Sequence, residues 1–500
     1  MTSHKNKRFA NLCERLQKDP GLPVKNPTVS YWQLPPSESV ATKQSSKFPT
    51  ETDVVVIGSG ITGCSVAKQV LENDPSIRVT VLEARNICSG ATGRNGGHIK
   101  ALPEHTYEDC LPVYGKEKTQ EIIDFTLGNV EALIKLGSEL PADLQRSSEV
   151  RRVETLNLFT TEETFADLTS TIRAFDEANL NVSRRGRLVQ PDELREKYGV
   201  SNATGGYVSS AGAAWPYRLI TGLFTGLLQQ HPERFTIEAQ TPVQNVEATE
   251  NGHYLVHTPR GSISTKTVVH STNGHAAHLL PGLRGPLFPV RGQMTAQTPT
   301  KVAEQHRGKR SWSIAYDAGF DYITQSCETG EIFIGGGLAQ SFDHGLSELG
   351  NVDDSSNSVL AFAHLGGALN ATFGLDEKTA MSAGVKATWT GVMGFTSDGL
   401  PLVGQLPKEA TLREGQGEWI AAGFNGYGMA NAWLCGKHIA DRVLQSENAE
   451  PIPSAYEISA ARLRNMSAEA GAVHWIDALG LEGRDPSVRP GTGNRPDSKL

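Results

Sequence analysis

The clearest pattern of apolar positions lies at Val54–Ile57, where four consecutive apolar residues run directly into a glycine-rich turn. An unbroken run of this kind, rich in valine, favours a strand buried in a parallel sheet. The positions that follow predict a helix over residues 63–73 and a second strand over residues 78–82. The pattern therefore begins with a strand, turn, helix and strand in succession.

The remaining pattern divides into helices and two groups of strands. Apolar positions in three- and four-residue steps predict helices over residues 112–140, 161–178, 191–198 and 217–230. Alternating or continuous apolar runs predict one group of strands at residues 241–246, 254–256 and 267–271. A second group is predicted at residues 288–294, 320–324 and 331–337. We expect the first group to complete the sheet that begins at Val54 and the second to form a separate sheet.

Residues 1–49 show no comparable pattern, and we interpret them as an extension that Tyr31 and Trp32 anchor to the body. The chain of 500 residues is long enough for two or three domains. Lysine and arginine total 47 against 55 aspartates and glutamates, a net charge of −8 that argues against nucleic-acid or anionic-membrane partners. No apolar run approaches the roughly 18 residues of a membrane span. The six cysteines lack metal-ligand spacing, so we expect reduced thiols and no metal site.

The glycine-rich turn predicts a dinucleotide site. Gly58 allows a tight turn, Gly60 allows close approach of a pyrophosphate, and Gly63 lets the helix pack on the strand. Free N–H groups at the helix N-terminus then face the phosphates. Glu83 ends the second strand, where a carboxylate accepts hydrogen bonds from ribose hydroxyls and disfavours a 2′-phosphate.

Two further glycine-rich segments bear on which dinucleotide is bound, because a nicotinamide enzyme needs only one such segment per dinucleotide. They cover residues 89–98 and 421–433, and the latter reads as a strand turning into a helix that runs to about residue 444. A second helix N-terminus aimed at the ligand would stabilise negative charge on a flavin ring as it is reduced. The alternative is a plain glycine-rich turn.

The chain ends in Ser498, Lys499 and Leu500, the tripeptide of the peroxisomal import signal. The preceding residues are rich in proline, glycine and arginine, so we expect an exposed tail that the import receptor can read. This predicts a peroxisomal location.

Together these segments resemble the FAD-dependent oxidoreductases of the D-amino acid oxidase superfamily. The resemblance covers residues 50–445, and the form of residues 91–97 is most similar to the γ-glutamylputrescine oxidase-like and sarcosine oxidase-like branch. It implies an α/β fold with a Rossmann-type, glutathione-reductase-like FAD-binding domain and an inserted, sheet-based substrate domain. The implied boundaries are an extension at 1–49, FAD-binding parts at 50–110, 205–285 and 385–446, substrate parts at 111–204 (mainly helical) and 286–384 (antiparallel sheet), and a tail at 447–500.

The resemblance also implies which residues bind FAD. They are Gly58, Gly60, Ile61, Thr62, Gly63, Glu83, Ala84, Arg85, Ser89, Gly90, Ala91, Thr92, Arg94, Asn95, Gly96, Gly97, His98, Val243, Asn425, Gly426, Tyr427, Gly428 and Met429. The implied chemistry is hydride transfer to flavin N5 from a carbon next to an amine nitrogen, followed by hydrolysis of the imine and reoxidation by oxygen to give hydrogen peroxide. The alternatives are a dehydrogenase with another acceptor and an FAD-binding scaffold or assembly factor without turnover.

The sequence departs from the family pattern at several positions. Met393 stands where several amino acid oxidases have the arginine that holds a substrate carboxylate, so we expect an amine without an adjacent carboxylate. Ala387 and Thr388 replace the flavin-linking cysteine of sarcosine-oxidase-like members, and Arg94 replaces the linking histidine of the dehydrogenases, which predicts non-covalent FAD. Phe333 falls near the position of the oxygen-activating lysine, for which Lys386 is a candidate substitute.

No residue stands out as a general base. Candidates for the site around the flavin are polar or aromatic side chains close to the motifs, namely His98, Tyr316, Tyr322, Lys386 and Trp389. A histidine there can accept a proton, and aromatic rings can flank a cationic amine. Each of these side chains also has a purely structural interpretation, because aromatic residues dominate protein cores.

Overall fold

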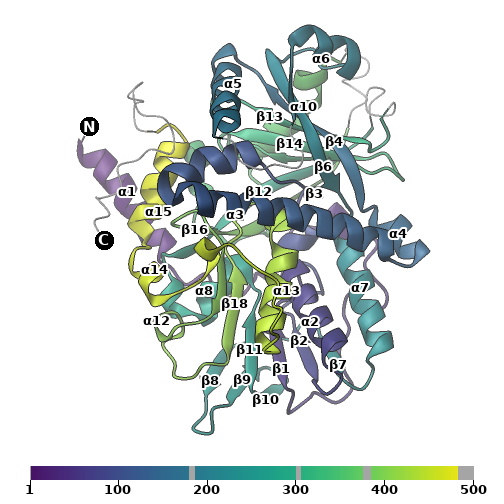
Figure 1. Ribbon diagram of the computed structural model, residues 1–500, viewed down its shortest axis with the longest axis vertical. Helices are drawn as coiled ribbons and strands as arrows, with labels where there is room; N and C mark the ends of the chain where they lie inside the picture. Colours follow the sequence, from purple (N-terminus) through teal and green to yellow (C-terminus); the bar gives the residue numbers. More distant parts are fainter. Residues whose placement is uncertain (1, 179–185, 300–305, 376–383, 482–500) are drawn as a thin grey trace.

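The computed structural model describes residues 2–178, 186–299, 306–375 and 384–481. In Figure 1 a six-stranded sheet occupies the lower half of the molecule and a nine-stranded sheet the upper half, with the long helix α3 (Pro103–Glu139) crossing between them. The glycine-rich segments lie where these two layers meet.

The six-stranded sheet has the strand order β17-β18-β11-β1-β2-β7. Its strands are β1 (Val54–Ile57), β2 (Val79–Leu82), β7 (Phe235–Glu238), β11 (Thr267–His270), β17 (Leu402–Gln405) and β18 (Glu418–Ala422). All neighbours are parallel except β17, which is antiparallel to β18. The strand, turn and helix predicted over residues 54–73 are confirmed, with α2 at Ile61–Asn73.

Strand β1 is apolar throughout because both of its faces are covered. Val54 and Val56 pack into a core shared with α2, α7 (Pro216–Gln230) and α13 (Ala432–Val443). Val55 and Ile57 face a three-stranded antiparallel meander made of β8 (Asn245–Ala248), β9 (Tyr254–Thr258) and β10 (Gly261–Thr265). The expectation that the first group of predicted strands completes the sheet of β1 is correct only for β11, because the segments at 241–246 and 254–256 belong to the separate meander. The strand predicted over 241–246 begins only at Asn245.

The nine-stranded sheet has the order β16-β12-β15-β14-β13-β4-β6-β3, and β5 pairs with β6. Its strands are β3 (His98–Ile99), β4 (Arg151–Phe159), β5 (Arg187–Val189), β6 (Gly205–Ala213), β12 (Leu287–Gln297), β13 (Arg310–Ala315), β14 (Phe320–Gln325), β15 (Ile332–Gly336) and β16 (Val385–Thr396). Only β13 and β4 are parallel to each other. Strands β6 and β16 lie in this second sheet, although the implied boundaries place their segments in the FAD-binding parts at 205–285 and 385–446.

The two faces of the nine-stranded sheet differ in character. One face carries apolar side chains such as Leu156, Trp312 and Ile323, and it is covered by α6 (Pro191–Tyr198) and α10 (Val359–Phe373). The alternate positions carry the polar and aromatic side chains Asn157, Ser313, Tyr322 and Trp389, and they face the glycine-rich segments. Other helices of this half are α4 (Ala142–Ser148) and α5 (Glu162–Glu177).

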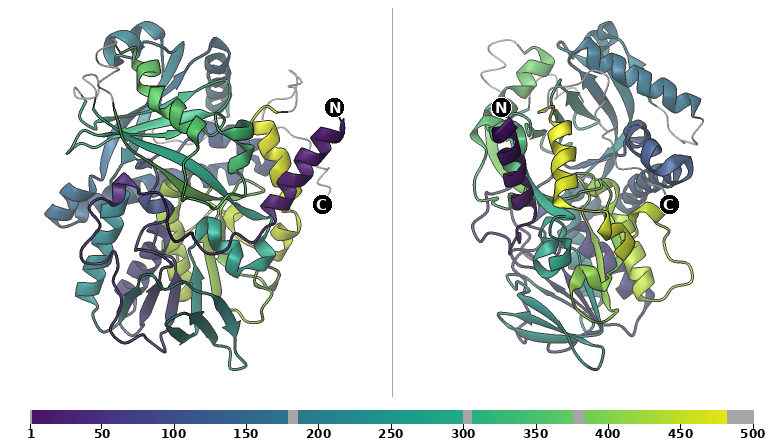
Figure 2. Two further views of the ribbon diagram at one scale, coloured as in Figure 1. Left: turned by 180° about the vertical axis from the view of Figure 1, so that it is seen from behind. Right: turned by 90° about the vertical axis from the view of Figure 1, so that its left-hand side faces the viewer.

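The two ends of the chain fold together. Helix α1 (Thr2–Leu16) lies beside α15 (Ala468–Ala478), and Leu12 and Leu16 are buried there (Figure 2). From α1 the chain runs across the back of the molecule between the two sheets (Figure 2, left). We call residues 24–33 of this segment the N-terminal strap. The expectation that Tyr31 and Trp32 anchor residues 1–49 to the body agrees with the structure, where both rings pack against Phe333. Helix α1 was not predicted, although Phe9, Leu12, Cys13 and Leu16 follow a helical spacing.

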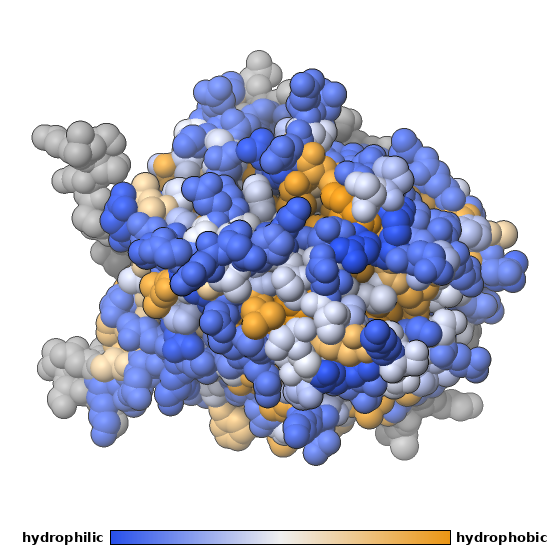
Figure 3. Space-filling view, turned by 90° about the horizontal axis from the view of Figure 1, so that it is seen from below, coloured by the Kyte–Doolittle hydropathy of each residue, from blue (hydrophilic) through white to orange (hydrophobic). Residues whose placement is uncertain are grey.

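Short helical elements complete the described chain. They are α8 (Ala276–Leu279), α12 (Lys408–Thr411), α14 (Ala460–Arg464) and the 3₁₀ turns at Tyr31–Gln33, Ala91–Gly93, Asn273–His275, Pro281–Leu283, Phe342–Glu348, Gly428–Ala430 and Ser454–Tyr456. The face seen from below is mainly hydrophilic with small apolar groups (Figure 3). Among the described helices, none combines the length and apolarity needed to cross a bilayer.

Candidate functional site

The first glycine turn connects β1 to α2 and has no room for side chains. A Cβ on Gly63 would lie 2.1 Å from the Gly58 carbonyl oxygen, and a Cβ on Gly60 would lie 2.9 Å from Thr92 Oγ1. Gly58 has a φ of +109° and sits against Ser271, at the carboxyl end of β11. Ile61 and Thr62 open α2 at this turn. The Ile61 N–H donates to Thr92 Oγ1, and the remaining N–H groups of the first turn are available to an anion.

Glu83 holds the same turn from the neighbouring strand. Its carboxylate accepts hydrogen bonds from the N–H (3.1 Å) and hydroxyl (2.7 Å) of Ser59 and from the N–H of Arg85 (2.9 Å). The carboxylate therefore lies at the carboxyl ends of β1 and β2, where parallel sheets bind ligands. Ala84 continues this loop. Val243 belongs to the buried cluster that includes Ile57 and Leu82, beneath the same edge.

The second glycine-rich segment is fixed by the buried side chain of Arg94. Its guanidinium donates to the carbonyl oxygens of Ser89 (2.7 Å), Thr390 (2.7 Å) and Thr28 (2.7 Å), and Asp354 lies 3.6 Å away. Burial lowers the pKa of Arg94 to about 10 while Asp354 opposes this change, so the guanidinium stays charged at neutral pH. Asp354 also pairs with Arg85 at 2.9 Å. Arg94 thus ties this segment to both the N-terminal strap and β16.

The N-terminal strap makes a second set of contacts with the segment. Ser30 Oγ donates to the Gly93 carbonyl (2.8 Å), and Trp32 Nε1 donates to the Asn95 carbonyl (2.5 Å). The Trp32 ring stacks on Phe333, with ring centroids 3.7 Å apart. The strap therefore connects the glycine-rich segment to the nine-stranded sheet.

The third glycine-rich segment docks on the other end of β16. Asn425 N–H donates to the Gly394 carbonyl (3.0 Å), and Asn425 Oδ1 accepts from the Thr396 N–H (2.9 Å). Tyr427 exposes 46 % of its surface, yet the surrounding protein raises its pKa to about 12, with the charge of Asp109 adding to the effect. Gly426, Gly428 and Met429 form the rest of this loop, and Asn129 of α3 donates to the Met429 carbonyl (3.0 Å).

In the nine-stranded sheet, one row of residues that pair across neighbouring strands faces these segments. We call it the register row. Neighbouring positions pair in the order Asn157, Ser313, Tyr322, Gly335, Met294 and Trp389. Tyr322 lies against Gly96, where a Cβ would come within 2.2 Å of its ring. Trp389 Nε1 donates to the Arg94 carbonyl (2.9 Å). The row therefore forms the wall of the site opposite the glycine-rich segments.

This combination of a dinucleotide edge and a facing sheet has counterparts among known proteins. The sequence matches the FAD dependent oxidoreductase family, DAO, over residues 53–442. The chain belongs to this family.

Individual relatives of the oxidoreductase are distant. The probable oxidoreductase OrdL of Haemophilus influenzae is 22% identical over 417 residues, which cover 80% of this chain and 86% of the relative. Glycine oxidase of Geobacillus kaustophilus superposes with a TM-score of 0.65 at 18% identity, covering 82% of this chain and 99% of that structure. L-proline dehydrogenase of P. horikoshii gives a TM-score of 0.61 at 21% identity, covering 82% and 97%. These structures share the fold of the oxidoreductase.

The residues present fit the family's cofactor, FAD. The three glycine-rich segments leave backbone N–H groups free of side-chain cover, which suits a pyrophosphate. Two buried hydroxyls beside the turn, Ser89 Oγ and Thr272 Oγ1, have no hydrogen-bond partner within the described chain. Buried polar groups of this kind normally have a partner, so they are available to a ligand. Gly90, Ala91 and Thr92 lie between Ser89 and Arg94 and bring this segment beside α2, because Thr92 Oγ1 accepts from the Ile61 N–H (3.0 Å).

The structure separates the five candidate residues for catalysis into two groups. Tyr322, Trp389 and His98 lie together on the site side, with the His98 and Tyr322 rings 6.4 Å apart. Burial holds the pKa of His98 well below its usual range, so this imidazole is neutral. Gly97 precedes it and accommodates a φ of +73° against the Ala214 carbonyl.

Tyr316 and Lys386 lie elsewhere. Tyr316 hydrogen-bonds Asp321 (2.9 Å), whose carboxylate also contacts His364 of α10 (2.7 Å), so this group lies on the sheet face opposite Tyr322. Lys386 forms an ion pair with Glu331 (2.8 Å), which raises the pKa of the lysine. Met393 packs against the apolar cluster that contains Leu12 and Leu16 of α1.

Sequence reasoning missed Lys100, two residues beyond His98. Its amino group reaches the register row and donates hydrogen bonds to both Asn157 and Ser313. The only sequence signal is the two-residue spacing from His98, which places both side chains on one side of an extended segment. The partners Asn157 and Ser313 are far away along the chain, and no local pattern marks them.

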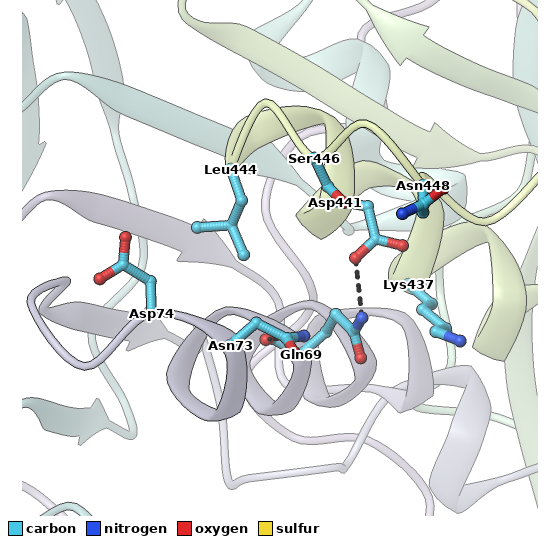
Figure 4. A pocket seen from close by; sticks show the side chains of 8 residues that line it. All are labelled: Gln69, Asn73, Asp74, Lys437, Asp441, Leu444, Ser446 and Asn448. Atoms are coloured by element: carbon cyan, nitrogen blue, oxygen red, sulfur yellow. Dashed lines mark hydrogen bonds between the residues drawn. The ribbon is translucent and has the colours of Figure 1, made fainter.

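Two other features lie apart from this site. A recess of about 340 Å³ lies at the carboxyl ends of α2 and α13, lined by polar residues including Gln69, Asn73 and Asp441 (Figure 4). Gln69 donates to Asp441 across it (2.7 Å). It lies at the opposite end of α2 from the glycine turn. All six cysteines are free thiols, and no group of described side chains is arranged to hold a metal ion.

Proposed function

We propose that this oxidoreductase is a peroxisomal amine oxidase with non-covalently bound FAD. The observation that carries the proposal is the meeting of the Arg94–Gly97 backbone with the row that contains Tyr322 and Trp389. When bound, FAD supplies the hydride acceptor for oxidation of a carbon next to nitrogen. The aromatic row offers faces that attract a cationic amine. The names of fold relatives, among them glycine oxidase and L-proline dehydrogenase, agree with chemistry at a carbon–nitrogen bond.

The chain's own residues support the substrate class and the form of the cofactor. Met393 is part of an apolar cluster and cannot form the two-pronged hydrogen bond that holds a carboxylate. We therefore propose an amine without an adjacent carboxylate as the substrate. The Arg94 side chain is hydrogen-bonded to backbone carbonyls, and neither Ala387 nor Thr388 provides a cysteine thiol that could bond to the flavin. Both observations support non-covalent binding of FAD.

Oxygen as acceptor and the peroxisomal location are parts of the same proposal. Ser498, Lys499 and Leu500 lie outside the described residues, so the support for import is the tripeptide itself. A product of hydrogen peroxide suits a compartment that destroys it. A peroxide assay over a panel of amines under air tests the reaction, and any active amine excludes a scaffold without turnover.

The acceptor needs its own measurement. The protein is reduced anaerobically with an active amine and then mixed rapidly with oxygenated buffer. We expect fast return of the flavin absorbance with one peroxide per flavin. Slow reoxidation without peroxide would instead show a dehydrogenase that uses another acceptor. The proposed import signal is tested by fusing the last residues of the chain to a fluorescent protein and recording whether the fusion enters peroxisomes. A fusion that lacks Leu500 is the control.

A further inference from the structure

Lys100 occupies a distinctive position in the register row. Its Nζ donates to Asn157 Oδ1 (2.5 Å) and Ser313 Oγ (2.9 Å). Asn157 is paired with Ser313, and Ser313 with Tyr322, so all three side chains share the face that meets Gly96. The amino group of Lys100 therefore lies on the site wall next to Tyr322.

The surroundings of Lys100 contain little negative charge. No carboxylate of the described chain lies close enough to Lys100 Nζ, within 4 Å, to form an ion pair. Glu104 is the nearest acidic influence, and its carboxylate already accepts a hydrogen bond from the Tyr207 hydroxyl (2.5 Å). Burial lowers the pKa of Lys100 to about 7, and Glu104 opposes this only in part.

Titratable groups from every neighbouring element act on this site. They are His98 on β3, Glu104 and His105 at the start of α3, Arg151 on β4, Tyr207 on β6 and Tyr322 on β14. His98 and His105 both have lowered pKa values because of burial, and burial raises the pKa of Tyr322, so these three are neutral near pH 7. Among these groups Lys100 has the pKa nearest to neutrality. Asp109 of α3, whose charge acts on Tyr427, comes next, with a pKa that burial raises to about 6.

We propose that Lys100 is the base of the substrate site and takes the proton from the bound substrate ammonium. The inference rests on the proposed amine oxidation. A neutral lysine has two N–H bonds, which suit the oxygens of Asn157 and Ser313, and a free electron pair that can accept a proton. An N–H bond of the substrate breaks, a third N–H bond forms on Lys100, and the electron pair stays on the substrate nitrogen.

The proton transfer prepares the substrate for oxidation. The freed electron pair on nitrogen would stabilise the cationic imine once FAD, when bound, accepts the hydride of the neighbouring carbon. Lys100 then releases its proton to water, which restores the neutral amine before the next cycle. A protonated Lys100 would instead repel the cationic substrate, so binding and reduction both require the neutral form.

The test measures the anaerobic reduction of the holoenzyme by an active amine in a stopped-flow instrument, between about pH 5.5 and 9.5. For the unchanged protein we expect the rate to rise with pH through about 7 and then level off. In Lys100→Met we expect the rate of flavin reduction to fall about 100-fold at neutral pH. The rate should recover only as the pH approaches the pKa of the substrate amine. Lys100→Arg stays charged and is expected to remain slow throughout.

Asn157→Asp separates proton transfer from a merely structural role. A carboxylate in contact with Lys100 raises the pKa of the lysine, so the midpoint of the rate profile should move up by about 1 to 3 pH units. Lys135→Met removes an exposed lysine of α3 and serves as the matched control with an unchanged profile. The visible flavin spectrum reports that each variant is folded and loaded.

The outcomes distinguish this inference from the proposed function. If amines reduce the flavin but Lys100→Met keeps the original pH profile, Lys100 is not the base. A loss confined to the KM of carboxylate-bearing amines would also overturn the inference, because it would make Lys100 a carboxylate contact. If no amine reduces the flavin in the unchanged protein, both proposals fail together.

Discussion

Gly63 shows most clearly how single residues create the site. It lies in the first turn of α2, and a Cβ there would meet the backbone oxygen of Gly58 at 2.1 Å. Backbone atoms cannot turn away as a flexible side chain can, so Gly63→Ala must push α2 from β1. We expect a loss of about 1 to 3 kcal/mol in the free energy of unfolding and loss of bound FAD.

Gly226 provides the matched control because it also lies inside a helix, α7, but a Cβ there has nothing within 4 Å. Gly226→Ala should raise the free energy of unfolding by about 0.5 to 1 kcal/mol and leave FAD content unchanged. Urea unfolding and the flavin absorbance per protein measure both effects. Equal FAD content in the two variants would contradict the steric role of Gly63.

Sequence reasoning succeeds at residues whose role is local. The reason given for Gly63, close packing of helix on strand, is the one that the structure shows. It fails at Lys100, whose partners Asn157 and Ser313 are 57 and 213 residues away in the chain. Register across a sheet decides which side chains meet, and a single strand does not reveal its neighbours.

At the scale of elements, the N-terminal strap connects segments that are distant in sequence. Trp32 donates to the Asn95 carbonyl and stacks on Phe333, so it holds the second glycine-rich segment against β15. Trp32→Phe keeps an aromatic ring but leaves the partly buried Asn95 carbonyl without its donor. We expect the FAD dissociation constant to rise about tenfold, which corresponds to about 1.4 kcal/mol.

Trp312 is the matched control for this change. It is equally buried but lies on the opposite face of the same sheet, and its Nε1 has no hydrogen-bond partner within the described chain. Trp312→Phe should lower the melting temperature of the apoprotein without changing the FAD dissociation constant. Thermal shift measurements with and without FAD give both quantities. If Trp32→Phe and Trp312→Phe changed the FAD affinity equally, a positioning role for the strap would be ruled out.

The strap also shows why residues 1–49 were interpreted as an extension. Helix α1 packs on α15 from the far end of the chain, and the strap is held by hydrogen bonds to backbone carbonyls. The strap shows no periodic hydrophobicity, whereas Phe9, Leu12, Cys13 and Leu16 of α1 follow a helical spacing that the interpretation overlooked. The strands around Val54 were predictable for the opposite reason, because both of their faces are buried by helices and a meander.

At the scale of the whole molecule, buried charge makes stability depend on pH. Glu418 on β18 contacts His270 (2.8 Å) and Arg413 (2.7 Å). Burial alone would raise the pKa of Glu418, but hydrogen bonds from these two partners outweigh it and lower the pKa to about 2 from a usual 4.5. The folded protein therefore binds this proton less readily than the unfolded chain does.

The sign of the effect follows from this difference. The stabilisation is present above about pH 4.5 and is lost as the pH falls toward about 2, with a total of about 3 kcal/mol. Guanidinium chloride unfolding at a series of pH values measures it. Glu418→Gln should be less stable at pH 7 and show a flatter decline below pH 4.5. Parallel declines for the two proteins would contradict the assignment to Glu418.

The central claim is that the three glycine-rich segments and the row of the nine-stranded sheet form one site for FAD and an amine. The most direct test is anaerobic titration of the purified holoprotein with a panel of amines while the visible flavin absorbance is recorded. We predict that the protein is yellow, that its FAD is released on denaturation, and that at least one amine without a carboxylate bleaches the absorbance. A colourless protein that does not take up FAD, or a flavin that no amine bleaches, would contradict the account.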